Sequence, residues 1–338
     1  MTAKIKKEKF ILLNKFPIFA YTFKKVFYSW STLAFVVISF LVTSGLILFT
    51  NKVYSITVEK QLEIFSNVFE VTFFVINVCI FYLIFLAIKA TQIFRDEIDD
   101  GTFLVIISKP ITKNSLLLEK YFAFQTIGGI YILSILFYSA GFSLIYFNSL
   151  EIIIYFLRNL FFIIFFLIIF QIIFSSIFIL ISLFISTKSL IIFASIVVIF
   201  IVFFNVVVPF FIIPDLSNAY NEDVRKISFS LKRTILEEQN NYYFLSFFNL
   251  GYQFGNMFVF ALNGFSHKSG TKLEMGDPGL FSRFGIIQYA LIRTKGSDIE
   301  ITGWTDFINA IYLYVFYIFF SSLMIYTTYF VLKIKDFQ

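Results

Sequence analysis

Charged residues are scarce in this sequence. Asp, Glu, Lys and Arg make up 14% of the chain, whereas soluble domains carry about a quarter. Hydrophobic residues make up 59%, and a soluble core of this length could not bury that much apolar surface. Most of it must face lipid or neighbouring helices inside a bilayer. The composition therefore predicts an all-α integral membrane protein.

Residues that bind metals or form disulfides are scarcer still. The chain has one cysteine, Cys79, inside an apolar run, and one histidine, His267, in a polar stretch. One thiol cannot form an intrachain disulfide, and these two residues cannot supply a thiol or multi-histidine metal site. We therefore expect no metal site in this chain.

A nucleotide-binding loop is missing as well. No stretch matches G-x-x-x-x-G-K-[ST], the pattern whose backbone amides and lysine hold nucleotide phosphates. We therefore expect the chain to have no ATPase site and no cofactor of its own. An intramembrane enzyme would need acids, histidine or asparagine gathered at one membrane face, and the sequence has no such cluster, so this is the least favoured class.

Long apolar runs predict six membrane-spanning helices. The runs lie at about residues 27–50, 68–94, 121–147, 160–185, 190–213 and 307–332. The first is of full membrane length, so we expect it to be retained as a span and not cleaved as a signal peptide.

The segments outside these runs define the remaining organisation. Lysines alternate with Phe, Ile and Leu in residues 1–26, which predicts an amphipathic helix in the membrane interface; a simple basic tail is the alternative. Residues 27–213 would hold spans one to five, and 306–338 span six and the tail. Residues 214–305 regain charge, Gly and Asn, which predicts an extramembrane insertion. Within it, residues 242–262 are apolar but interrupted, so we expect them to pack against the span ends and not to form a further span.

The net charge of +6 indicates orientation in the membrane. Lys and Arg flank the apolar runs, so a nucleic-acid partner is not expected. They concentrate in residues 1–25 and 95–120, in the turn at Lys188 and at the C-terminus. These segments share one side if six spans are crossed. The sequence therefore predicts a multi-pass protein of the cell membrane with both termini cytoplasmic and an extracytoplasmic insertion.

Residues 95–120 form the most informative stretch, RDEIDDGTFLVIISKPITKNSLLLEK. Its acidic cluster extends span two into the cytoplasm, and Gly101 can end that helix at its C-terminal cap. An apolar strip follows where the chain should be wet, so it needs a partner. Pro110 interrupts the segment again. An ordinary loop, in which the acids are solvated and Gly and Pro are punctuation, is the alternative.

This stretch resembles the cytoplasmic signature of ABC-2 type transporter permeases. The resemblance rests on Glu97, Gly101-Thr102, the apolar run, Ser108, residues 110–113, residues 116–118 and Lys120. In that family the segment lies between spans two and three and forms a coupling helix that docks on the ATP-binding subunit. The amphipathic N-terminal helix and the six spans also fit. One departure is Glu119, where the family often has glycine before the final lysine.

The resemblance implies the permease subunit of an ATP-driven exporter. ATP and Mg²⁺ would be bound by a separate ABC ATPase subunit, and two permease subunits would form a homo- or heterodimer in the lipid bilayer. Phe103 and Ile106 would be the buried anchors of the docking element. The expected ATPase-coupling residues are Glu97, Asp99, Asp100, Gly101, Thr102, Phe103, Ile106 and Pro110.

The substrate path is weakly specified. Gln125, Gln171 and Asn205 are polar groups at membrane depth and are therefore candidates. For Gln171 an interhelical hydrogen bond is the more common role. The scarcity of buried charge argues against an ion-coupled carrier and for a lipid-like or apolar substrate. A different function also stays open: a membrane-anchored receptor or scaffold that acts through its extracytoplasmic subdomain.

Overall fold

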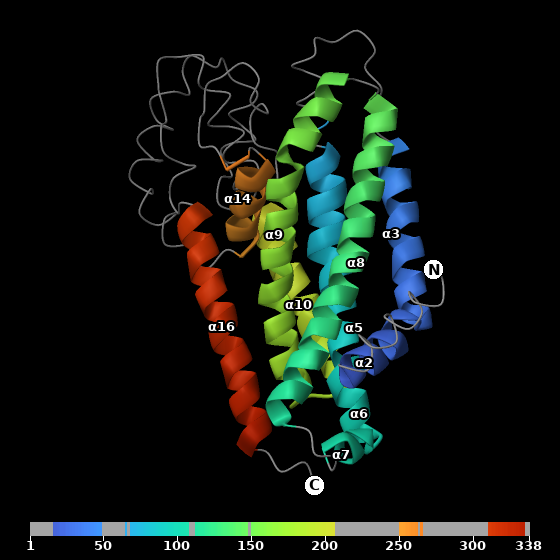
Figure 1. Ribbon diagram of the computed structural model, residues 1–338. Helices are drawn as coiled ribbons and strands as arrows, with labels where there is room; N and C mark the ends of the chain where they lie inside the picture. The colour runs from blue at the N-terminus through green and yellow to red at the C-terminus, as the bar shows by residue number, and fades with distance from the viewer. Residues whose placement is uncertain are drawn as a thin grey trace, which may run out of the picture.

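The computed structural model describes most of the membrane part of the chain. The described residues are 16–48, 65, 68–107, 112–147, 150–206, 250–262, 264–265 and 310–334. Every element in these ranges is a helix (Figure 1). The all-α class expected from the sequence is therefore correct for this part of the chain.

Twelve helices follow one another along the described residues. They are α2 (Pro17–Phe27), α3 (Trp30–Leu48), η1 (Glu70–Tyr82), α5 (Leu83–Ala90), η2 (Thr91–Arg95), α6 (Asp96–Asp99), α7 (Thr102–Ile107), α8 (Lys113–Phe147), α9 (Leu150–Ser182), α10 (Thr187–Val206), α14 (Leu250–Leu262) and α16 (Ala310–Ile334). η1 and η2 are π-helices, and they join α5 and α6 in one continuous rod.

Five helices are long and apolar enough to cross a membrane. They are Trp30–Leu48, Thr72–Asp99, Lys113–Tyr146, Leu150–Ser182 and Ala310–Ile334. These match five of the six expected spans. The expected fifth span begins in α10 (Thr187–Val206), whose side chains are described as far as Ile201, and residues 207–213 lie outside the described part of the chain. The count of six therefore stays a prediction.

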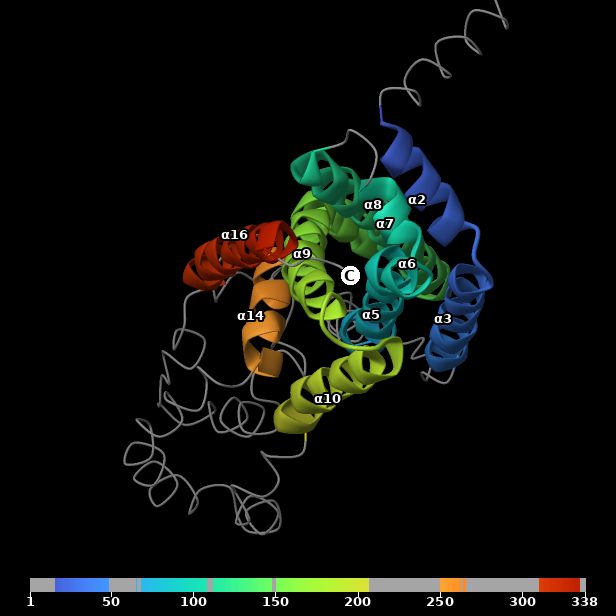
Figure 2. The same ribbon diagram turned by 90° about the horizontal axis from the view of Figure 1, so that it is seen from below.

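Span two is the centre of the bundle. In its most apolar window 72% of the residues are buried, against 22% in both α3 and α16, so those two helices are peripheral. The view from below places α5 among α3, α8, α9 and α10 (Figure 2). Stacked rings fix this packing: Phe85 lies 4.1 Å and Tyr82 5.8 Å from Tyr131 of α8, centroid to centroid. A displacement of span two would therefore change its packing against most helices of the bundle.

Helix α14 is the described part of the insertion. It packs against α9 and α16: Tyr155 donates a hydrogen bond to the carbonyl oxygen of Leu262 at 3.0 Å, and Tyr314 to that of Met257 at 2.9 Å. Thirteen residues rise about 20 Å, which is too short to cross a bilayer core of about 30 Å. The ring of Phe254 lies 5.2 Å from those of both Phe170 and Phe174, on interior turns of α9. α14 therefore packs along the flank of α9 and not only against the span ends. Apart from Gly264 and Phe265, the remaining residues of 214–305 lie outside the described chain.

Candidate functional site

The segment between spans two and three folds as a helical hairpin at the lower end of the bundle (Figure 1). Helix α6 ends at Asp99, and Gly101 has a φ of 70°. The amide of Gly101 bonds the carbonyl of Ile98 at 3.2 Å. Glycine adopts this left-handed conformation at little cost, and a Cβ added there would meet no atom within 4 Å. The expected helix stop at Gly101 is confirmed.

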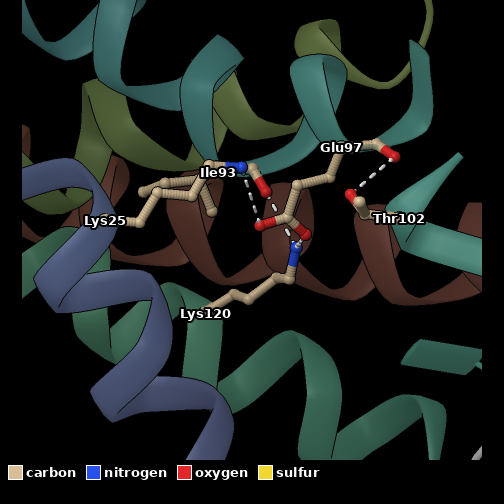
Figure 3. A network of polar contacts seen from close by, with 5 residues as sticks. All are labelled: Lys25, Ile93, Glu97, Thr102 and Lys120. Carbon is tan, nitrogen blue, oxygen red and sulfur yellow. Dashed lines mark hydrogen bonds and ion pairs between the residues drawn. The ribbon is translucent and has the colours of Figure 1, made fainter. Parts of the chain in front are cut away.

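A buried ion pair joins the hairpin to span three. Glu97 of α6 and Lys120 of α8 are both fully buried, and the ammonium of Lys120 donates to Oε2 of Glu97. Lys120 also donates to the carbonyl oxygen of Ile93 at 2.8 Å (Figure 3). Its Nζ lies 5.0 Å from the ring centroid of Phe94 and 5.2 Å from that of Phe103. The buried ammonium therefore has both an anionic partner and aromatic faces.

A second cation approaches the same carboxylate from another element. Lys25 of α2 places Nζ 3.6 Å from Oε1 of Glu97 (Figure 3). Glu97 therefore connects α2, α6 and α8, and we call Lys25, Glu97 and Lys120 the charged junction. Desolvating Glu97 and Lys120 is costly, and removing either of these two leaves an uncompensated buried charge. α6 and α8 should consequently keep a fixed relative position, whereas Lys25 is 34% exposed.

Glu119 fixes the other end of α2. Its Oε2 accepts hydrogen bonds from the backbone amides of Ile18 at 3.0 Å and Phe19 at 3.1 Å. The first amides of a helix lack intrahelical partners, and a carboxylate there also interacts favourably with the helix dipole. Pro17 at the first turn has no amide to satisfy. Ser115 donates to the other carboxylate oxygen at 3.0 Å and holds it in place.

Lys89 is a further buried cation that the sequence reasoning missed. It is fully buried in α5 and donates to Ser29 Oγ and Ser31 Oγ, both at 2.7 Å, and to Gln92 Oε1 at 3.0 Å. These acceptors match the three protons of the ammonium. Ser29 lies between α2 and α3, so Lys89 ties that elbow to span two. The position of Lys89 inside an apolar run is the feature of the sequence that could have indicated a buried, hydrogen-bonded cation.

The exposed face of the hairpin differs from the expected one. Phe103 is fully buried inside the chain, so its expected role as an anchor that contacts a partner is wrong for this structure. Helical periodicity turns it inward onto the junction. Ile106 is half-buried, whereas Val105 is 61% exposed and Thr102, Asp99 and Asp100 are exposed. Pro110 lies outside the described residues.

The candidate substrate-path residues lie in different settings. Gln125 of α8 donates to Ser175 Oγ of α9, and Gln171 of α9 donates to the carbonyl oxygen of Gln125 at 2.6 Å. A Cβ added to Gly128 would lie 2.8 Å from Nε2 of Gln171, so the glycine permits this close approach. The two glutamines thus join α8 to α9. Asn205 belongs to a different helix, near the C-terminal end of α10.

Within the described ranges, no group of three or more His, Cys, Asp or Glu residues could hold a metal ion. The model of a family described as ABC-2 family transporter protein matches residues 16–328. The match includes α2, the hairpin, the spans and the insertion. No curated protein and no solved structure matches the chain.

Proposed function

Because the chain belongs to the ABC-2 family of transporter proteins, we propose that it is the permease subunit of an ATP-driven exporter in the cell membrane. A separate ABC ATPase subunit binds ATP and Mg²⁺ and docks on the hairpin of residues 95–120. A second permease subunit, identical or related, completes a dimer in the bilayer.

The observation that carries this proposal is the charged junction beneath the hairpin. Helix α7 sits directly on it through Phe103, and the junction reaches α2 through Lys25 and α8 through Lys120. A displacement of α7 is therefore transmitted to α2 and α8 through side-chain contacts, and no loop has to deform first. The elbow between α2 and α3 is bonded to Lys89 of span two through Ser29 and Ser31, so movement of α2 is transmitted to span two. α3 begins directly after this elbow and moves with it.

The docking surface in this proposal is the outer face of α6 and α7. It combines the exposed acids Asp99 and Asp100 with the apolar side chain of Val105. An apolar anchor within a charged rim is the usual composition of a protein interface. Glu97, Gly101 and Phe103 then act from beneath, because they set the position of that surface.

Affinity co-purification from native membranes in mild detergent tests the proposal. The intact chain should bring down a nucleotide-binding ATPase, and Val105→Asp should lose it because a charge replaces the apolar anchor. Ile334→Asp is the matched control: it places the same charge at a position that is 62% exposed, at the lower end of α16.

Two results would count against the proposal. If Val105→Asp keeps the ATPase while Ile334→Asp loses it, the docking surface lies elsewhere on the lower face. If no ATPase accompanies the intact chain even after crosslinking, the permease assignment fails, and a receptor that acts through residues 214–305 becomes the better explanation.

A further inference from the structure

A cavity of about 500 Å³ lies between α9, α14 and α16, away from the hairpin. Its walls include Ile173 and Ile177 of α9, Phe254 of α14, and Phe316 and Tyr317 of α16. Ligand pockets in proteins commonly have volumes of about 300–1,000 Å³. The cavity is therefore large enough to hold a ligand.

The walls are apolar and closed on the protein side. Ile173 and Phe254 are 1% exposed, and Phe254 stacks on Tyr317 with centroids 5.0 Å apart. The polar groups at the wall bond to each other, because the hydroxyl of Tyr317 donates to Oε1 of Gln253. Among the lining residues that the structure describes, none is charged. These walls suit a hydrocarbon and offer no counter-charge for a head group.

The opposite side of the cavity is formed by residues that face outward. Tyr312 and Phe316 line the cavity and are 71% and 58% exposed. α9 and α16 are both apolar enough to span the bilayer. Tyr312 lies in the first turn of α16, whereas Phe316 of α16 and Ile173 of α9 lie on interior turns of their helices. Figure 2 shows α16 on the periphery of the bundle, with α14 beside it. An opening beside Phe316 therefore leads into the hydrocarbon of the membrane.

From this arrangement we infer that one acyl chain of a membrane lipid occupies the cavity between α9, α14 and α16. At this depth the solvent is hydrocarbon, and an unfilled space of this size would forfeit the dispersion contacts of its lining. A chain that enters between Tyr312 and Phe316 restores those contacts. The inference is independent of the ATPase partner.

Photolabelling of the full chain tests the site. The protein is reconstituted in nanodiscs of phosphatidylcholine that include a phosphatidylcholine with a diazirine on one acyl chain, and the adducts are mapped by peptide mass spectrometry. Adducts should concentrate on Ile177, Phe316 and Tyr317. Lipid-facing positions on the same helices, such as Phe161 and Phe330, should carry fewer.

A matched pair of substitutions separates the cavity from the general lipid surface. Ile173→Phe adds bulk inside the cavity and should lower the cavity adducts to the level of the lipid-facing positions. Ile168→Phe makes the same change on a face of α9 that is 51% exposed and should leave them unchanged. Ile177→Phe repeats the test from the same wall if Ile173→Phe reduces folded protein in size-exclusion chromatography.

Three outcomes would overturn the inference. The first is an even spread of adducts over all exposed apolar positions, and the second is the same adduct pattern in Ile173→Phe and Ile168→Phe. The third outcome is a pattern that changes when the labelled lipid carries a glycerol head group in place of choline, since an uncharged apolar wall should bind the hydrocarbon chain alone.

Discussion

The carboxylate of Glu119 decides how the N-terminal helix docks. Glu119→Ala removes the acceptor from the amides of Ile18 and Phe19, and loss of a helix cap costs about 1–2 kcal/mol. We expect a lower thermal unfolding midpoint of the detergent-purified protein, measured by intrinsic fluorescence. Glu151→Ala is the control: this exposed acid lies in the first turn of α9, so only a dipole effect of about 0.5 kcal/mol is at stake. Equal shifts in the two variants would remove the capping role.

Glu97 and Lys120 should behave as one unit. Glu97→Gln and Lys120→Met should each destabilise the protein by about 3–5 kcal/mol, because each leaves a buried group without its partner. The double variant should cost less than the sum of the two, and a double-mutant cycle of denaturant unfolding measures the difference. Strict additivity would show that the pair does not interact.

Lys25 belongs to the same junction but should contribute less to stability. Its side chain is 34% exposed, and 3.6 Å separates its Nζ from the carboxylate. Water screens such a pair, so Lys25→Ala should cost about 1 kcal/mol or less. The charged junction is thus a buried pair with a more exposed cation beside it, and the outer cation is the member that can separate while the pair stays intact.

At the scale of the element, the turn of the hairpin depends on one left-handed residue. Gly101→Ala places a side chain at a φ of 70°, which costs about 1–2 kcal/mol, whereas asparagine adopts this conformation more easily. Hydrogen exchange of the amides of residues 96–107 should be faster in Gly101→Ala and close to the intact protein in Gly101→Asn. If the amides exchange equally fast in both variants, the left-handed conformation of residue 101 is not the cause of the faster exchange.

The spans and the helix stop could be read from the sequence because both depend on local information. Hydropathy located five membrane-length helices, and Gly101 stands directly after the acidic end of span two. The orientation of Phe103 was wrong because an apolar residue in a wet segment can face either a partner or its own chain. The choice between these two orientations depends on Lys120 of α8, which belongs to another helix and lies against the ring of Phe103.

Glu119 and Lys89 were missed for a related reason. Glu119 caps amides about 100 positions earlier in the chain, and Lys89 bonds hydroxyls about 60 positions earlier. No periodicity within one segment reports such pairs. The departure from glycine at position 119 was visible, but its meaning depended on where α2 lies.

For the whole molecule, the two ends of the bundle should face different compartments. The hairpin and the start of α10, which includes Ser189, lie at one end, where Thr187 donates to Oδ1 of Asp96 at 3.3 Å. The charge distribution predicts that this end lies in the cytoplasm. Cys79 is the one cysteine of the sequence and is buried. Cys79→Ser therefore provides a background without thiols. In that background, Ser189→Cys and Thr102→Cys should react with a membrane-impermeant maleimide only after the cells are opened.

The insertion supplies the opposite reporter. Ser269→Cys lies within residues 214–305 and should react in intact cells, because the insertion is expected outside. This pattern would place the charged junction on the side where ATP is available and the insertion on the side where an exporter releases its substrate. Labelling of Thr102→Cys in intact cells would invert the molecule. A cytoplasmic ATPase could not then reach α7, and the proposed coupling would fail for a reason independent of any contact in the hairpin.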